Sequence, residues 1–331
     1  MVTSISDMKL QFKELSGDTV LQNKKKRAIT KGRKLILSFL KLIILVGISY
    51  VILGPIITII SHAFFSPSDV YNPSVLLFPL NPTLENFRLT FLRMDFLKTL
   101  GNTLIYIILL TLIQLLITSM AGYGFARFDF PCKNILFACV IITIVIPTHT
   151  IMLPLYQHFR MFDVFGIFKV ITGESKNLLS STTPMYMMTL LGCGLRSGLY
   201  IYIFNQFFRG LPKEIEEAAF IDGAGAWYTY FRIMLVNAMP SVITVSVFSL
   251  VWQYNDMFYS KLFSMPVTKI LSLRLASVQA TIEFVDQVKD PMIAQLNVYA
   301  GVVLAMIPIV LIYLFLQRYF MEGVERSGIV G

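Results

Sequence analysis

A polar stretch from Arg209 to Ala224 separates two apolar blocks and carries the residue types best placed to interact with another molecule. Pro212 suits the first turn of a helix. Three acidic residues follow where a helix dipole is positive: Glu214, Glu216 and Glu217. Gly223 can adopt the left-handed backbone that ends such a helix. Carboxylates at one end of a short helix can pair with basic residues of a partner, so the chemistry predicted here is docking.

Spacing divides this predicted helix into two faces, because residues three and four apart lie on the same side. One face is acidic, and the other is small and apolar, with Ile215, Ala218, Ala219 and Ile221 or Asp222. A second helix after Gly223 would complete a helix–turn–helix knob. Two readings fit these residues: the knob enters a groove on a partner protein, or the helix lies flat on a membrane surface.

Motifs for catalysis are absent from the sequence. There is no G-x-x-x-x-G-K-[ST] string to surround a phosphate and no G-x-S-x-G nucleophile turn. His62, His149 and His158 lack metal-ligand spacing, and the 3 cysteines form no metal pattern. The sequence predicts no enzyme activity, no bound metal and no cofactor in this chain.

Composition indicates a membrane protein. Hydrophobic residues make up 56% of the chain and charged residues 14%, with a mean hydropathy of +0.69, whereas soluble domains carry about 25% charged residues. The net charge of +9 includes a basic cluster at 24–34, directly before the first apolar block. Such a cluster is a topology signal, so no nucleic-acid partner is expected.

The predicted fold is an all-α integral membrane protein with six transmembrane helices, since a span needs roughly 20 apolar residues. The blocks lie at about 35–61, 100–125, 135–156, 184–208, 234–255 and 294–316. The basic cluster predicts that both termini are cytoplasmic, together with the loops 126–134 and 209–233. Three parts follow: an N-terminal cytoplasmic extension at 1–34, expected to be disordered, a six-helix transmembrane domain at 35–316, and a cytoplasmic tail at 317–331.

Prolines and one arginine interrupt the apolar blocks. The prolines are Pro55, Pro147, Pro154, Pro240 and Pro308; each bends its helix, either for packing or to line a cavity that opens and closes. Arg196 lies among glycines and serine in the fourth block. It either contacts a translocated solute, or snorkels to the interface or marks the true start of its helix.

The string Glu217-Ala218-Ala219-Phe220-Ile221-Asp222-Gly223-Ala224 resembles the E-A-A-x-x-D-G-A loop of permease subunits in binding-protein-dependent ABC importers. Further similarity to the carbohydrate branch of that family covers about 84–331. It includes Asn102-Thr103, 121–127, Ile146-Pro147, Leu153-Pro154, 206–212, Trp252, Asn255, Asp256 and the tail 317–331. Two features depart from the pattern: the proline that usually follows Leu235 comes only at Pro240, and the outer segment around 173–177 is longer.

The resemblance implies a mechanism and a set of partners. The coupling surface toward a cytoplasmic ATPase would comprise Glu214, Glu217, Ala218, Ala219, Asp222, Gly223 and Ala224. Candidates for the translocation path are Arg196, Trp252, Asn255 and Asp256. The implied partners are a second permease, forming a heterodimer, two ATPases that bind ATP and Mg, an extracytoplasmic solute-binding protein and the lipid of the bacterial plasma membrane.

The sequence is compatible with three functions. The first is ATP-driven import of an oligosaccharide or related polar solute by alternating access. The second is an ion-gradient-driven carrier, which would need relay carboxylates within its spans. The third is a membrane scaffold whose loop recruits a cytoplasmic partner.

Overall fold

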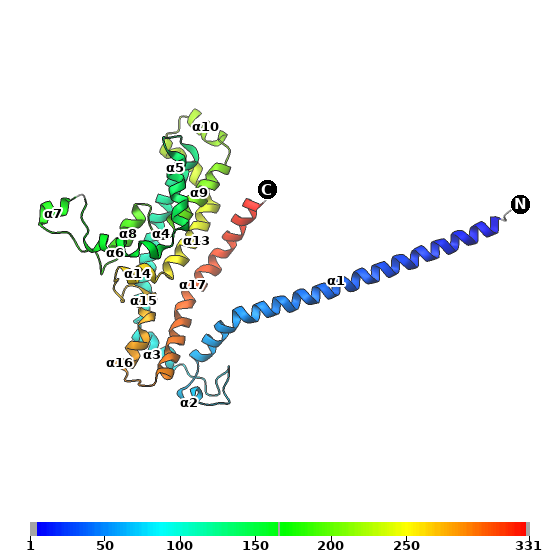
Figure 1. Ribbon diagram of the computed structural model, residues 1–331, viewed down its shortest axis with the longest axis horizontal. Helices are drawn as coiled ribbons and strands as arrows, with labels where there is room; N and C mark the ends of the chain where they lie inside the picture. Colours follow the sequence, from blue (N-terminus) through cyan, green and yellow to red (C-terminus); the bar gives the residue numbers. More distant parts are fainter. Residues whose placement is uncertain (1–4, 165, 329–331) are drawn as a thin grey trace. The chain divides into compact units, whose positions relative to one another are not determined.

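The computed structural model describes the backbone of residues 5–164 and 166–328, and the side chains of 31–164, 166–171, 173–315 and 317. It separates into two units, Met1–Ser61 and His62–Gly331. The second unit holds the packed helices and every predicted site residue (Figure 1).

The first unit consists of most of one helix, α1 (Ile5–Ala63). Its stretch Lys31–Ala63 is long and apolar enough to cross a membrane. The side chains from Leu35 to Leu53 are largely exposed, as expected for a surface that faces lipid. The described part of the N-terminal extension, from Ile5 to Lys34, is helical, which differs from the expected disorder. Pro55 lies inside this helix and does not end it.

The second unit is built from helices joined by turns and loops. In order these are α2 (Pro67–Val70), α3 (Glu85–Arg93), α4 (Phe96–Arg127), α5 (Lys133–Val145), η1 (Thr148–Ile151), α6 (Met152–Arg160), α7 (Ile167–Thr172), α8 (Thr183–Leu190) and α9 (Ser197–Gly210). They are followed by α10 (Glu214–Ile221), α11 (Ala226–Tyr228), η2 (Thr229–Met234), α12 (Leu235–Asn237), α13 (Met239–Tyr254), α14 (Phe258–Leu262), α15 (Leu271–Ala276), α16 (Val278–Val285) and α17 (Pro291–Gly328). The predicted all-α fold is therefore confirmed.

Helix α4 is the centre of this unit, because it packs along both α9 and α13. Helix α17 in turn packs along α13 and α3. The contact between α4 and α9 is close at Gly122, where an added Cβ would lie 2.5 Å from the Cβ of Phe204. Small residues allow membrane helices to approach in this way. A buried aromatic cluster with Tyr200 and Phe208 extends this contact.

The apolar blocks correspond to helices, although not all are single helices. Phe96–Arg127 and Pro291–Phe315 are each long and apolar enough to span a membrane. Two further segments are long and apolar enough only as bent helix pairs: α5 turns by 101° into η1 and α6, and the helices from α11 to α12 turn by 77° into α13. Pro147 and Pro240 lie at these bends, as the sequence predicts, whereas Pro308 lies inside a continuous α17 and Pro154 inside α6.

The fourth apolar block differs from the prediction of one helix over 184–208. Helix α8 ends at Leu190 and α9 begins only at Ser197. Arg196 directly precedes α9 and adopts a left-handed backbone with φ of 59°. The reading of Arg196 as the true start of its helix is thus confirmed. Gly192, with φ of 74°, provides the other turn of this break.

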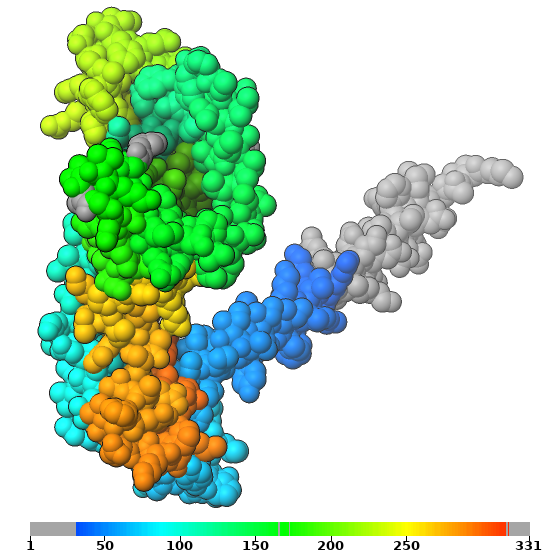
Figure 2. All heavy atoms as spheres, turned by 60° about the vertical axis from the view of Figure 1, so that its left-hand side comes forward, coloured from blue at the N-terminus to red at the C-terminus, as the bar shows by residue number. Residues whose placement is uncertain are grey.

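The two ends of the second unit carry different segments. The loop that contains α10 protrudes at one end, and α2, α3 and α16 lie at the opposite end (Figures 1 and 2). The loop residues form the yellow-green projection at the top of Figure 2. This separation agrees with the predicted division between the 209–233 loop and the segments 62–99 and 256–293.

Candidate functional site

The loop after α9 folds as the predicted helix–turn–helix. Helix α10 begins at Glu214, with its acidic residues in the first turn, and ends at Ile221. Gly223 then takes φ of 85°, which suits glycine. The amide of Gly223 donates to the Phe220 carbonyl at 3.1 Å, and the amide of Ala224 to the Ala219 carbonyl at 2.9 Å. These bonds close the helix before α11 begins.

The faces of α10 divide differently from the predicted single ridge of small residues. Ala219 is buried and Ile215 is half-buried, so both face the bundle. Ala218 is exposed, because consecutive helical residues are about 100° apart. The other exposed members of the predicted set are Glu214, Glu217, Asp222 and Gly223, and Ala224 is half-buried. A partner would therefore meet carboxylates around Ala218.

Large apolar side chains extend this exposed surface. Ile221 is 85% exposed and Trp227 is 66% exposed. Phe220, Tyr228 and Phe231 are also exposed. Exposed apolar side chains gathered on one projection mark an interaction site. Sequence reasoning missed the aromatic residues of α11, although the run Trp227-Tyr228 in a predicted polar loop was a signal. We call Glu214, Glu217, Ala218, Phe220, Ile221, Asp222, Trp227 and Tyr228 the docking surface.

A buried ion pair holds this loop to the bundle. The Nε of Arg127, at the end of α4, lies 2.9 Å from the Oε2 of Glu216 in the first turn of α10. Their side chains are only 6% and 10% exposed. The Tyr123 hydroxyl donates to the other carboxylate oxygen, and the Arg127 guanidinium donates to the Leu211 carbonyl at 2.9 Å. Because the carboxylate of Glu216 is paired inside the bundle, Glu214 and Glu217 are the glutamates of α10 that remain exposed to a partner.

Arg196 and Trp252, two of the residues predicted for the translocation path, are in contact. The Arg196 guanidinium carbon is 4.9 Å from the centre of the Trp252 ring, a cation–π contact. The half-buried indole also stacks on Phe248 and Tyr200, with ring centres 5.6 and 6.0 Å apart. The arginine is exposed and its position is fixed by an aromatic stack from α9 and α13.

Asn255 and Asp256 have local partners in the structure. The carboxylate of Asp256 accepts hydrogen bonds from the amides of Tyr259 and Ser260 in the first turn of α14. The side-chain amide of Asn255 donates to the Val251 carbonyl at 2.9 Å, and the residue is exposed. Asp256 therefore positions the segment after α13.

A buried polar cluster that the sequence analysis did not select fixes the start of α9. The amide nitrogen of Gln114 donates to the Leu195 carbonyl at 2.8 Å and lies 3.0 Å from the Ser197 hydroxyl. Its oxygen accepts from the Gln253 amide at 3.1 Å. Gln114 has no exposed surface. Lone glutamines in apolar blocks were the available signal, since buried polar groups in spans need partners.

No group of 3 or more His, Cys, Asp or Glu side chains that could hold a metal ion occurs within the described residues. His62 stacks with Tyr299, and His149 contacts Phe258 edge-on. These histidines pack against aromatic rings.

Comparison with known proteins identifies the family. A family model described as "Binding-protein-dependent transport system inner membrane component" matches residues 114–326. The arabinooligosaccharides transport system permease protein AraQ of Halalkalibacterium halodurans is 26% identical over 306 residues, covering 89% of this chain and 98% of the relative. The trehalose transport system permease protein SugB of Mycobacterium tuberculosis is 24% identical, covering 84% of this chain and 92% of the relative.

A solved structure has the same fold. It is described as a bacterial ABC transporter involved in the import of the acidic polysaccharide alginate, and it aligns with a TM-score of 0.69 at 20% identity. The alignment covers 86% of this chain and 96% of the other. With the family match over most of the α4 to α17 bundle, the chain belongs to the inner membrane components of binding-protein-dependent transport systems: it is a permease subunit of the ABC importer type and not an enzyme.

Proposed function

We propose that this chain is one permease of an ATP-driven importer that moves an oligosaccharide or a related polar solute into the cytoplasm by alternating access. The observation that carries the proposal is the docking surface on α10 and α11, which is exposed outward and anchored inward by the Arg127–Glu216 pair. The solute class is supported by the sugar-transport names of the relatives.

The proposed partners follow from the family and from this surface. Two cytoplasmic ATPases bind ATP and Mg, and one receives α10 in a cleft with basic and apolar walls. A second permease forms the other half of the pathway, and an extracytoplasmic solute-binding protein delivers the solute. We assign the termini, the loop 209–233 and the tail 317–331 to the cytoplasm, on the basic cluster at 24–34. The permease domain is proposed to comprise 35–316 with six spans.

The contacts of α10 support its role in coupling. A force that the ATPase applies to α10 is transmitted to α4 through the buried Arg127–Glu216 pair and the hydrogen bond of the Tyr123 hydroxyl to Glu216. Helix α4 packs against α9 at Gly122, where there is no room for a side chain, so the two helices should move together. Helix α9 begins directly after Arg196, which we propose lies in the translocation path with Trp252. We propose that Asn255 and Asp256 also belong to the translocation path, where they hold the segment after α13 in position.

Uptake into sealed vesicles tests the proposal. Vesicles containing the complete complex and binding protein are given labelled oligosaccharide, with ATP on the ATPase side. We expect uptake that requires ATP and persists when ion gradients are collapsed by ionophores. Uptake that needs an ion gradient and no ATPase would establish the secondary-carrier alternative, and ATPase recruitment without any uptake would establish the scaffold.

A further inference from the structure

A basic cavity opens near the end of the bundle that carries α10. It has a volume of about 810 Å³ and lies between the end of α4, the start of α5 and the end of α9. Four basic side chains line it, from Arg127, Lys133, Arg209 and Lys213, with one acidic side chain, Asp129. The lining carries a formal net charge of +3, so it attracts anions.

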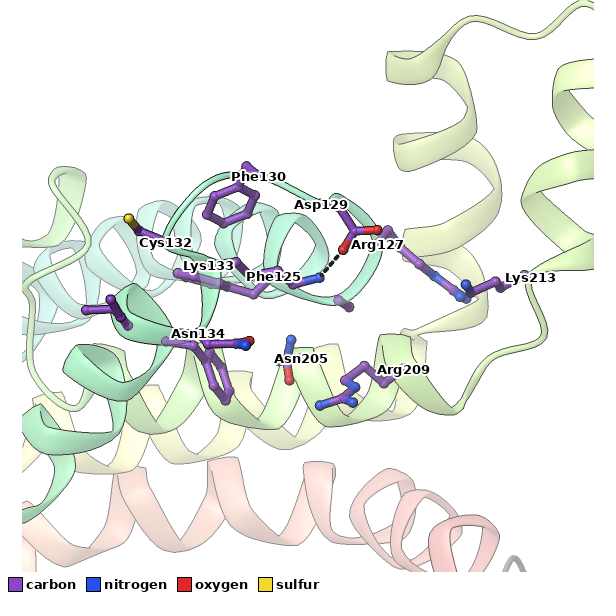
Figure 3. Close-up of a pocket in the computed structure, with 13 residues that line it drawn as sticks. Phe125, Arg127, Asp129, Phe130, Cys132, Lys133, Asn134, Asn205, Arg209 and Lys213 are labelled. Atoms are coloured by element: carbon purple, nitrogen blue, oxygen red, sulfur yellow. Dashed lines mark hydrogen bonds and ion pairs between the residues drawn. The ribbon is translucent and has the colours of Figure 1, made fainter.

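Two of these cations have no ion-pair partner within the described residues. Arg127 pairs with Glu216, and Lys133 pairs with the almost fully exposed Asp129 at 3.1 Å. Arg209 and Lys213 form no recorded ion pair in the described part of the chain. Figure 3 shows the Arg209 side chain extending along α9 toward Asn205, four residues earlier on the same face. The guanidinium of Arg209 and the ammonium of Lys213 are thus available to a ligand.

The backbone at the start of α5 adds hydrogen-bond donors to the same wall. Cys132 precedes the helix and supplies no side-chain cap. Among the described residues, the amides of Asn134 and Ile135 have no recorded acceptor, as expected in the first turn of a helix. Uncapped amides and the positive end of the helix dipole favour an anion.

A buried polar atom also lacks a partner in this wall. Asn205 is 1% exposed and lines the cavity, yet its Oδ1 has no hydrogen-bond partner in the described structure. Its amide nitrogen lies 3.5 Å from the Gly122 carbonyl, which fixes the oxygen in its present position. A buried acceptor of this kind requires a donor. Inorganic phosphate supplies both the negative charge and that donor through its own hydroxyl, and a lipid phosphodiester supplies the donor through a hydroxyl of its headgroup.

We propose that this cavity binds a phosphate group, through Arg209, Lys213 and the first amides of α5. Apolar side chains of Phe125, Phe130 and Phe137 line the same cavity, so an acyl chain could lie beside the phosphate. The two sources of this chemistry are the headgroup of an anionic phospholipid and free phosphate. Basic pockets between membrane helices on the cytoplasmic side take anionic headgroups in this way. The site adjoins Arg127, which also holds α10, so its ligand contacts the anchor of the docking surface.

Binding is measured on the full-length permease with the lipid composition controlled. The protein is reconstituted in nanodiscs of phosphatidylcholine, with or without 20% phosphatidylglycerol, and the retained lipids are counted by native mass spectrometry. Inorganic phosphate is titrated separately into phosphatidylcholine nanodiscs and followed by thermal unfolding. Neither measurement requires transport, so failure of this proposal is separate from failure of the importer function.

We expect selective retention of phosphatidylglycerol or saturable binding of phosphate. Arg209→Gln and Lys213→Gln should each weaken binding about fivefold, the effect of about 1 kcal/mol per cation near a membrane surface. Asn134→Asp should abolish binding and leave the unfolding temperature unchanged or higher, because an acidic residue suits the first turn of α5. Arg232→Gln is the matched control, since Arg232 is exposed at the same end and does not line the cavity.

The two arms distinguish the sources of the phosphate. Retention of phosphatidylglycerol that millimolar phosphate does not displace identifies a lipid headgroup site, and displacement at that concentration identifies free phosphate as a ligand. The proposal is overturned if neither binds, or if Arg232→Gln weakens binding as much as Arg209→Gln does.

Discussion

The guanidinium of Arg127 and the carboxylate of Glu216 form an ion pair, 2.9 Å apart, between the last turn of α4 and the first turn of α10. Within the described residues, this pair links the loop 209–233, which carries the docking surface, to α4, the central helix of the bundle. Both side chains are nearly inaccessible to water, so this contact is not screened as an exposed pair would be.

Removing one partner of this pair should detach α10 from α4. Glu216→Ala leaves Arg127 buried without a counter-ion, at a cost of about 3 kcal/mol or more. We expect a lower unfolding temperature and loss of ATPase co-purification. Glu217→Ala is the matched control: Glu217 is exposed, so the unfolding temperature should not change while ATPase association weakens. Equal unfolding temperatures for the two variants would argue against the anchoring role of Glu216.

The turn after α10 requires glycine at one position only. Gly223→Pro imposes φ near −65° where the chain has 85° and removes the hydrogen bond that the Gly223 N–H donates to the Phe220 carbonyl, a cost of about 3 kcal/mol locally. Transport and ATPase co-purification should be lost while the protein still extracts as a folded permease. Gly225→Ala should be tolerated, because Gly225 has φ of −74° and open space around its Cα. Normal transport by Gly223→Pro would contradict the coupling proposal.

Two neighbouring glycines of α4 should respond in opposite ways to alanine. At Gly122 the added methyl would lie 2.5 Å from the Cβ of Phe204 and 3.0 Å from the Ile201 carbonyl oxygen. Separating α4 from α9 should cost about 1–3 kcal/mol, measured as reduced thermal stability in detergent. Gly124→Ala meets nothing within 4 Å and should be neutral or stabilising. If both variants unfolded at the same temperature, the close contact would be wrong.

The segment after α2 should loosen in acid. The amide of Asn81 donates to Asp69 at 2.9 Å, and this bond lowers the pKa of Asp69 below 3.8. Its stabilising contribution is therefore complete above pH 3.8 and is lost as pH falls through the lower, native pKa. Pepsin should cut the exposed Leu76 to Phe78 stretch faster below that pH.

An Asp69→Asn variant provides the control for this pH dependence. It cannot titrate, so its cleavage, normalised to an unstructured peptide, should not vary with pH. A parallel increase in the variant would assign the acid effect to another group.

The helix–turn–helix at 209–233 was predictable because its signals are local. Pro212, the glutamates of the first turn and Gly223 act within a few residues of one another. The Arg127–Glu216 pair was not predictable, since it joins residues far apart in sequence and Glu216 resembles its neighbour Glu217 in type. Only the contacts of Glu216 with Arg127 and Tyr123 of α4 distinguish the inward glutamate from the outward one.

The break before α9 was partly visible in the sequence. Gly192 and Gly194 indicated an irregular helix around Arg196, but the apolar run on both sides favoured a single span. The buried side-chain amide of Gln114 stabilises this break, because it donates to the Leu195 carbonyl and lies 3.0 Å from the Ser197 hydroxyl, on either side of Arg196. The cytoplasmic position of the tail 317–331 stays a prediction: α17 continues to Gly328, and the side chains from 318 onward lie outside the described residues.

The uninterrupted length of α4 has a mechanical consequence. The helix contains 32 residues without a proline, unlike the bent pairs around it. At a rise of about 1.5 Å per residue it is a rod of about 48 Å, so a tilt of about 5° applied at Arg127 would displace its other end by about 4 Å. A small rotation at the α10 end is thereby amplified at Phe96, on the far side of the bundle.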